Sequence, residues 1–223
     1  MAWTLSSYAS IVFNDAPVWY LPTGLTISIW AKPSGGAGPL LEKYGGPYEW
    51  TFGYANSTVY AWCYDDTTSS SIGRAGANGY DPLQWTHLTF SFNGGTSYTD
   101  TTLYANGINA GGAAFITNYP GPFASIRDTT KNVVHGGSSS GLGGPLIGSF
   151  AELCVHNVCL TQQEIKQEMR YPGSVKRGLI LYIPGSTNRL DCSGQGINST
   201  TDTASNYTGI YLPPIIGRNE ILV

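Results

Sequence analysis

Hydrophobic and polar residues alternate with a period of two along much of this chain. Leu88, Phe90 and Phe92 share one face of residues 86–92, and polar side chains occupy the other face, as a half-buried strand requires. The Asn106-Gly107 pair then supplies the two positive-φ positions of a tight hairpin. The same kind of pattern, bounded by turn residues, predicts strands at Ile11–Phe13, Thr26–Ala31, Leu40–Lys43, Tyr48–Tyr54, Thr58–Tyr64, Gln84–Phe92, Thr101–Tyr104, Asn132–His135, Leu146–Val155 and Leu179–Ile183.

One short helix interrupts this pattern. Thr161 is expected to cap its first turn while Glu164 reaches back in a capping box, and the Tyr-Pro-Gly sequence at 171–173 ends it. Long loops are predicted for three stretches that are rich in Gly, Ser or Pro, namely Thr67–Asp81, Gly111–Lys131 and Gly136–Pro145. Such long loops are frequent places for binding.

Composition supports an all-β protein of one domain. The chain has 223 residues with 29 Gly, 13 Pro and 15 Tyr, and only 11% of its residues are charged. It is therefore rich in turn and strand formers and poor in the residues that fill helices. The net charge of -3 and the scattered Lys and Arg residues offer no basic surface, so nucleic acid is not expected as a partner. No apolar stretch is long enough to predict a membrane span.

Four segments, taken in order along the chain, are similar to segments of the LamG/concanavalin-like family. They are Leu25–Pro33 (LTISIWAKP), Trp85–Asn93 (WTHLTFSFN), Leu103–Gly107 (LYANG) and Phe150–Ile165 (FAELCVHNVCLTQQEI). The resemblance implies a two-sheet antiparallel β-sandwich of the concanavalin-like jelly-roll type, with one short peripheral helix and an extended C-terminal segment. Ala151 stands where the family usually has Asp, which argues against an acid-dependent role at that strand.

The pattern changes beyond Pro172, and we divide the chain there. Residues 1–172 are predicted to form the sandwich, and residues 173–223 a C-terminal strand followed by an extended apolar tail. The tail has too many apolar residues for a solvated linker and too many prolines for a helix. We therefore expect it to dock on the sandwich or on a neighbouring subunit. The predicted assembly contacts are Ile210, Tyr211, Leu212, Ile215, Ile216 and Leu222.

Aromatic residues give the best indication of a binding surface. Tyr60, Trp62 and Tyr64 share one face of a predicted strand, and smaller residues occupy the other. If the smaller residues face the core, these rings form an outward ridge that suits a sugar ring or a protein partner. In the alternative, the rings fill the core. Trp30 and His87 are added as candidate ligand-binding residues because their strands match central strands of the family.

Catalysis has little support in the sequence. A retaining glycoside hydrolase of this fold needs two carboxylates about 5–5.5 Å apart, usually delivered by an E-x-D-x-x-E strand that is missing here. Glu152 stands alone on its strand, and Glu49 has no acidic partner two residues later. No histidine lies in a recognisable nucleophile motif. We therefore predict no catalytic residues.

Calcium is the one cofactor left open, because many concanavalin-like domains hold it at a loop edge. Five aspartates lie in predicted loops or strand ends where they could contribute: Asp65, Asp66, Asp81, Asp100 and Asp128. We prefer the interpretation that they cap turns, which needs no metal. Of the four cysteines, Cys63 and Cys154 lie inside predicted strands, and we interpret them as buried apolar residues rather than as partners in a disulfide.

These observations lead to three functional hypotheses. The first is a non-catalytic structural or interaction protein of a large assembly, a virion accessory of a bacteriophage such as a capsid decoration or tail component, whose partners are other protein subunits. It draws on the apolar tail and on the start at Met1, which lacks the features of a signal peptide. The second is a carbohydrate-binding lectin module that uses the Trp62 ridge, with or without calcium. The third is a glycoside hydrolase or polysaccharide lyase. The expected location is a virion or an extracellular surface.

Overall fold

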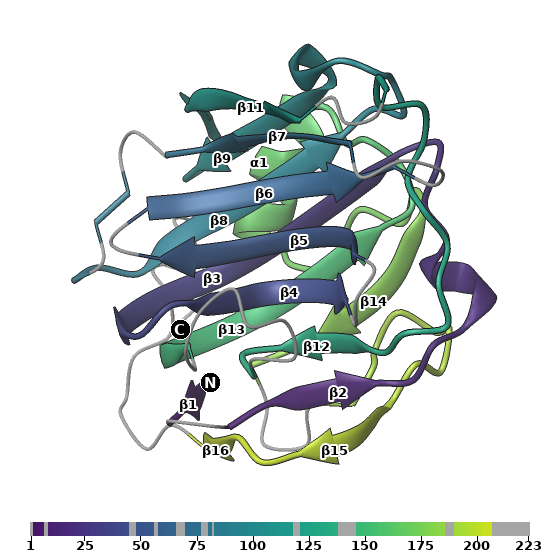
Figure 1. Cartoon of the computed structure of the whole chain (residues 1–223). Coiled ribbons are helices and arrows are strands. Elements are labelled where there is room, and N and C mark those ends of the chain that lie inside the picture. The colour runs from purple at the N-terminus through teal and green to yellow at the C-terminus, as the bar shows by residue number, and fades with distance from the viewer. Residues whose placement is uncertain are drawn as a thin grey trace.

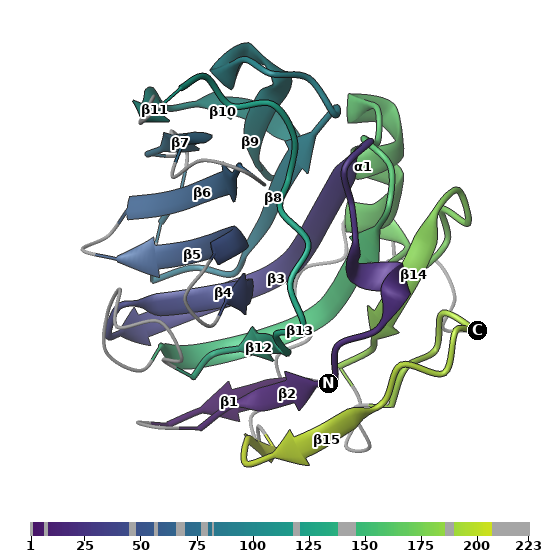
Figure 2. The ribbon, with the colours of Figure 1, turned by 45° about the vertical axis from the view of Figure 1, so that its right-hand side comes forward.

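The computed structural model describes residues 2–6, 9–44, 48–55, 58–65, 70–76, 80–81, 83–117, 121–137, 146–185 and 190–206. Two antiparallel sheets lie face to face, and the helix lies outside one of them (Figures 1 and 2). This arrangement confirms the predicted concanavalin-like β-sandwich. We call the sheet nearer the viewer in Figure 1 the front sheet and the other the back sheet.

The front sheet has the strand order β11-β7-β6-β5-β4-β12-β2-β15. Its strands are β2 (Ile11–Phe13), β4 (Gly38–Tyr44), β5 (Tyr48–Ala55), β6 (Thr58–Tyr64), β7 (Ser71–Ala75), β11 (Ala113–Thr117), β12 (Val133–His135) and β15 (Ser199–Asp202). The back sheet has the order β10-β9-β8-β3-β13-β1-β16, and β14 also pairs with β13. Its strands are β1 (Trp3–Leu5), β3 (Leu25–Gly35), β8 (Thr86–Phe92), β9 (Thr101–Ala105), β10 (Ile108–Gly111), β13 (Ile147–His156), β14 (Leu179–Ile183) and β16 (Ser205–Asn206).

The core lies between the sheets and is built from alternate residues of each strand. On the front sheet, Trp50 pairs with Cys63 and Phe52 with Ala61, so a large ring stands beside a small residue. All of these side chains are buried in the main hydrophobic cluster. Phe52 reaches the back sheet, where its ring lies 6.2 Å from that of Phe90 between centroids. Matching large to small residues in this way fills the interior without voids.

His135 joins the two sheets through two hydrogen bonds. Its Nδ1 donates to the carbonyl oxygen of Leu40 on the adjacent front-sheet strand, and its Nε2 accepts from Nε1 of Trp3 on the back sheet at 3.0 Å. The imidazole is fully buried, and burial lowers its pKa to about 4. Because Nε2 acts as an acceptor, this geometry requires the neutral ring.

The helix α1 (Gln162–Arg170) covers the outer face of the back sheet, as Figure 2 shows. The predicted capping box is confirmed, because Thr161 Oγ1 accepts from the Glu164 amide and Glu164 Oε2 accepts from the Thr161 amide. Ile165 and Met169 of this helix are buried. The Trp30 indole donates to the carbonyl oxygen of Met169 at 3.4 Å, which ties the helix to β3.

Two of the predicted loops contain strands that the sequence pattern did not reveal. The β7 strand falls within Thr67–Asp81, and β11 falls within Gly111–Lys131. The loop prediction was wrong for these residues because β7 forms its ladder against β6, and β11 in turn against β7. Gly and Ser residues can join a sheet wherever a neighbouring strand presents free backbone groups. Most of the third predicted loop, residues 138–145, lies outside the described residues.

The described part of the C-terminal region adds strands to both sheets. β14 pairs with β13, β15 with β2, and β16 with β1. The boundary at residue 172 stays a prediction. The apolar tail, with its six predicted assembly contacts from Ile210 to Leu222, lies outside the described residues.

Candidate functional site

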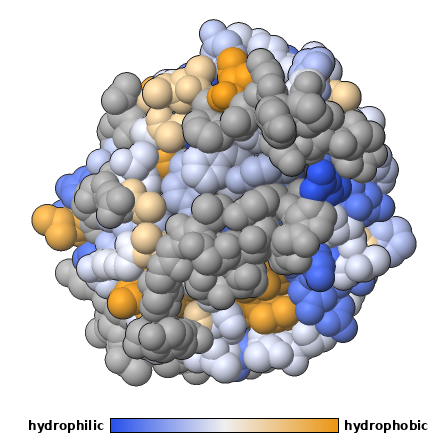
Figure 3. Space-filling view, in the orientation of Figure 1, coloured by the Kyte–Doolittle hydropathy of each residue, from blue (hydrophilic) through white to orange (hydrophobic). Residues whose placement is uncertain are grey.

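The aromatic ridge, formed by Tyr60, Trp62 and Tyr64 of β6, faces away from the core. Val59, Ala61 and Cys63 of the same strand belong to the hydrophobic core cluster, so the alternation of β6 turns the three rings to the outer side of the front sheet. Figure 3 shows this side of the molecule, with a pale surface of intermediate hydropathy over β6. Of the two interpretations open from the sequence, the structure favours the outward ridge.

Two of the three rings of the ridge stand opposite a glycine, whereas Tyr64 stands opposite Ser71. Tyr60 stands opposite Gly53 of β5, and Trp62 stands opposite Gly73 of β7. A Cβ on Gly53 would meet the Tyr60 ring at 2.3 Å, and one on Gly73 would meet Trp62 Cδ1 at the same distance. The two rings stack on each other with centroids 4.5 Å apart and an interplanar angle of 20°. Gly53 and Gly73 therefore leave the space that this aromatic surface occupies.

Exposure differs along the ridge. Tyr60 is only 6% exposed, and its burial raises the pKa of the phenol to about 12, so it supports the ridge more than it offers a contact. Trp62 and Tyr64 are partly buried and keep some accessible surface. The row through Trp62 continues onto Thr51 of β5 and Glu42 of β4, and both of these polar residues are almost fully buried.

Trp30 and His87 form a pair, but not with the ridge. They are direct partners on β3 and β8 of the back sheet, and their ring centroids are 5.4 Å apart. Both are almost fully buried beneath the α1 side of this sheet, and burial lowers the pKa of His87 to about 3. The five residues predicted for ligand binding are thus divided between two sheets, because strand order cannot be read from the alternation of residues.

A buried charge cluster lies at the end of β4. The Lys43 ammonium contacts Glu49 Oε1 at 2.7 Å, Asp15 Oδ1 at 2.9 Å and Asp128 Oδ1 at 3.6 Å. It also donates to the carbonyl oxygen of Thr129 at 2.8 Å. Lys43 and Glu49 have no exposed side-chain surface. Burial raises the pKa of Glu49 to about 7, against the opposing effect of Lys43.

Three of the aspartates considered for calcium accept hydrogen bonds from backbone amides. Asp65 Oδ2 accepts from the amide of Ala124, Asp81 Oδ1 from that of Leu83, and Asp100 Oδ2 from that of Ser97. Within the described ranges, no three His, Cys, Asp or Glu side chains are grouped so that they could hold a metal ion. Asp66 lies outside those ranges.

Glu152, which was considered for catalysis, contacts a tyrosine, and the cysteines form no disulfide. Glu152 Oε2 accepts from the Tyr182 hydroxyl at 2.7 Å, and Glu152 adopts a left-handed φ of 57° where β13 bulges. All four cysteines are free thiols, and Cys63 and Cys154 are buried as predicted.

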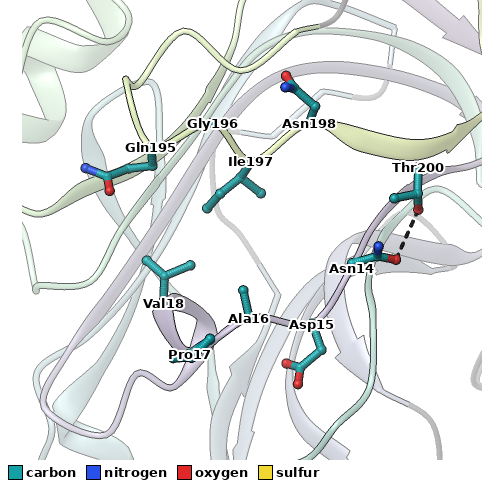
Figure 4. Close-up of a pocket in the computed structure, with 10 residues that line it drawn as sticks. All are labelled: Asn14, Asp15, Ala16, Pro17, Val18, Gln195, Gly196, Ile197, Asn198 and Thr200. Atoms are coloured by element: carbon teal, nitrogen blue, oxygen red, sulfur yellow. Dashed lines mark hydrogen bonds between the residues drawn. The ribbon is translucent and has the colours of Figure 1, made fainter.

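A pocket of about 390 Å³ opens between the turn at 14–18, which follows β2, and the turn at 195–200, which leads into β15 (Figure 4). Sequence reasoning missed it. Both segments are rich in turn residues, which was the available signal, but their proximity depends on the pairing of β15 with β2. The two paired strands lie near opposite ends of the sequence, so a local sequence pattern could not predict that they meet.

No helix among the residues described in the structure is long and apolar enough to cross a membrane.

Comparison with known proteins identifies structures that share this fold. No curated protein sequence matches this chain. A structure described as a "putative carbohydrate binding protein" from Bacteroides ovatus ATCC 8483 aligns over 93% of this chain and 60% of its own, with 13% identity and a TM-score of 0.64. The ligand binding domain of botulinum neurotoxin serotype D, solved with N-acetylneuraminic acid, aligns over 74% of this chain and 40% of its own, with 14% identity and a TM-score of 0.53. The chain therefore spans less than two thirds of either structure.

A third structure, a heptameric SAP-like pentraxin from Limulus polyphemus, aligns over 93% of this chain and 85% of its own, with 15% identity and a TM-score of 0.47. At these identities the first two structures, with TM-scores of 0.64 and 0.53, establish the shared sandwich and nothing more. The sequence profile of the concanavalin A-like lectin/glucanases superfamily matches residues 5–166. The chain belongs to that superfamily.

Proposed function

We propose that this protein is a non-catalytic carbohydrate-binding protein and that the aromatic ridge on the front sheet is its binding surface. The observation that carries the proposal is the stacked Tyr60–Trp62 pair on the outer side of the front sheet. Flat aromatic rings suit the apolar face of a sugar ring, and adjacent polar groups can bind its hydroxyls. The carbohydrate-related structures that share the fold support this choice.

The test compares Trp62→Ala with a matched control on a glycan array, with and without calcium. Tyr171 is 59% exposed and lies just after α1, away from the ridge, so Tyr171→Ala removes an exposed ring elsewhere. We expect Trp62→Ala to weaken glycan binding about tenfold, or about 1.4 kcal/mol, and Tyr171→Ala to leave it unchanged. An array without signal in both conditions, or equal binding by both variants, would contradict the proposal. Circular dichroism verifies that each variant is folded.

The absence of catalysis is part of the same proposal. The Glu49 carboxylate contacts an ammonium and the Thr129 backbone, and the Glu152 carboxylate contacts a tyrosine hydroxyl. These contacts suit structural roles for both acids. Incubation with β-glucans and with uronic-acid polymers is expected to give no new reducing ends and no unsaturated products. Release of either product would instead support the hydrolase or lyase hypothesis.

A second candidate function is a structural role in a large assembly, such as a virion accessory protein of the capsid decoration or tail type. It is favoured by the four free thiols, since unpaired cysteines are typical of proteins that fold and assemble in a reducing compartment. The apolar sequence of residues 210–223 would supply the contact. A truncated chain without these residues should stay folded and lose self-association or incorporation in sedimentation experiments. Unchanged assembly by the truncated chain would exclude this role for the tail.

A further inference from the structure

The strand β11 is the outermost strand of the front sheet and lies near the top of the molecule in Figure 1. It pairs with β7 on one side over five consecutive residues, Ala113 to Thr117, without a bulge. Among the described residues, its backbone makes no hydrogen bond to any other backbone segment. Alternate residues of an antiparallel strand direct their N–H and C=O groups to opposite sides. The outer side of β11 therefore presents free donors and acceptors.

The other sheet edges that the structure describes are protected from further pairing. The outer side of β14 is covered by the segment that follows it, because the Cys192 amide donates to the carbonyl oxygen of Tyr182 at 2.7 Å. The ladders of β10 and β15 each contain a register shift, and β16 has only two residues. Bulges and short strands are common ways to keep an edge from pairing. The sequence of β11, AAFIT, has no proline and no charge, and its ladder is regular.

The core side of the front sheet is open along β11. Ile116 is the direct partner of Ile72, which is buried in the main hydrophobic cluster, and Ala114 lies two residues away on the same face. Ile116 is nevertheless 46% exposed, and Ala114 is exposed as well. Figure 3 shows apolar surface over β11 at this edge. One more strand beside β11 would cover these side chains.

The position of β11 is fixed by a change of sheet just before it. The chain leaves β10 on the back sheet and enters β11 on the front sheet through Gly111 and Gly112, whose φ values are 68° and 104°. Glycine adopts such values without steric cost. A Cβ on Gly112 would lie 2.7 Å from the carbonyl oxygen of Gly76, so this link packs closely against the end of β7. A partner would thus meet a strand that is already extended, which lowers the entropic cost of binding.

We infer that β11 pairs with β11 of a second copy of this chain, antiparallel about a two-fold axis, so that two front sheets form one continuous sheet. In the register centred on residue 115, Ala114 lies opposite Ile116 of the second copy, and the symmetric contact repeats this pair. A small side chain then stands beside a large one on the core side. Residues 108–117 carry no charge, so this segment brings no like charges together, and it offers no ion pair to a charged partner. The inference goes beyond the proposed function, because it uses neither the ridge nor a glycan.

The dimer is expected to be weak, because a ladder of five residues per chain is smaller than the roughly 1,200 Å² of a standard interface. Sedimentation velocity of the full chain from about 10 µM to 1 mM should show a reversible shift from monomer toward dimer. Hydrogen exchange of the backbone amides in β11 should slow over the same range. A chain that stays monomeric throughout would overturn the inference.

Two double variants test the register itself. In Ala114→Lys/Ile116→Lys, each new lysine would face a lysine of the second copy, and Ala114→Glu/Ile116→Glu would oppose glutamates in the same way. Each variant alone should therefore remain monomeric. An equimolar mixture places lysine opposite glutamate at both positions, so a heterodimer should form. No association in the mixture, under conditions where the unmodified protein dimerises, would refute this pairing.

The matched control lies at the opposite edge of the front sheet. Thr201 is exposed on β15, so Thr201→Lys adds an exposed edge charge there and should leave dimerisation unchanged. The chain without residues 210–223 should also dimerise, which separates this contact from the tail. Equal loss of dimer in Thr201→Lys and in the double variants would contradict the assignment to β11. Circular dichroism verifies folding, and if a double variant does not fold, Ile116→Lys decides alone, with an expected weakening of at least about tenfold; unchanged dimerisation in that variant would refute the inference.

Discussion

Protonation of His135 should weaken the connection between the two sheets. In the folded protein Nε2 accepts a hydrogen bond from Trp3, and Nδ1 donates one to the Leu40 carbonyl oxygen. A second ring proton would point at the Trp3 donor, so the folded state resists protonation. Burial lowers the pKa of the ring from 6.5 to about 4.

The sign and size of the effect follow from this difference. Below pH 6.5 the unfolded chain binds a proton that folded His135 does not, so stability is complete above that pH and falls as the pH drops toward 4. One pKa unit corresponds to 1.36 kcal/mol, so the full loss is about 3 kcal/mol, of which about 2 kcal/mol should be gone at pH 5.

The perturbation that isolates this effect is His135→Phe, which keeps a buried ring and removes the titrating group. Urea unfolding of the two proteins is measured at pH 7.5 and pH 5. At pH 7.5 the variant should be less stable by about 1–3 kcal/mol, because Trp3 Nε1 and the Leu40 carbonyl oxygen lose their partner. At pH 5 the gap should shrink by about 2 kcal/mol. The other histidines titrate in both proteins and cancel.

Val133→Ala serves as the control, since Val133 is buried on the same strand and does not titrate. It should lower stability equally at both pH values. If the free energies of unfolding of His135→Phe and the unmodified protein differ by the same amount at pH 7.5 and pH 5, the reasoning is refuted. A His135 imidazole pKa above 6 by NMR would refute it directly.

Three further predictions concern packing, charge and capping. Gly73→Ala would place a Cβ 2.1 Å from a backbone oxygen, whereas Gly35→Ala would meet nothing within 4 Å; thermal unfolding should show a loss of about 2 kcal/mol or more for the first and almost none for the second. Lys43→Met leaves the buried Glu49 carboxylate without its cation and should cost about 3–5 kcal/mol in urea unfolding, and adding Glu49→Leu should recover a large part of it; no recovery in the double variant would contradict this account. Thr161→Ala removes the helix cap and should cost about 1 kcal/mol by the same measurement, and an unchanged midpoint would show that the cap contributes nothing.

Local patterns in the sequence predicted the elements whose conformation depends on near neighbours. Asn106 and Gly107 adopt φ values of 52° and 72°, because an Asn-Gly pair tolerates the left-handed region that a tight hairpin requires. The capping box of Thr161 and Glu164 formed for a similar reason, since both bonds lie within one helical turn. Alternation also separated the two faces of β6, but only the structure showed that the face with the smaller side chains meets the core.

Contacts between distant segments were decided only by the tertiary structure. Alternation shows that Trp30, His87 and Trp62 share their faces with polar or aromatic neighbours, but not that the first two lie beneath α1 on another sheet. The pocket likewise exists because β15 pairs with β2. The sequence by itself therefore determined the all-β class, the turns and the alternation of faces along single strands, because these depend on steric and hydrogen-bonding preferences of adjacent residues, and the sandwich was implied by the resemblance to the LamG/concanavalin-like family. Strand order and the joining of loops into a site depend on how whole faces pack together, and only the folded chain could show them.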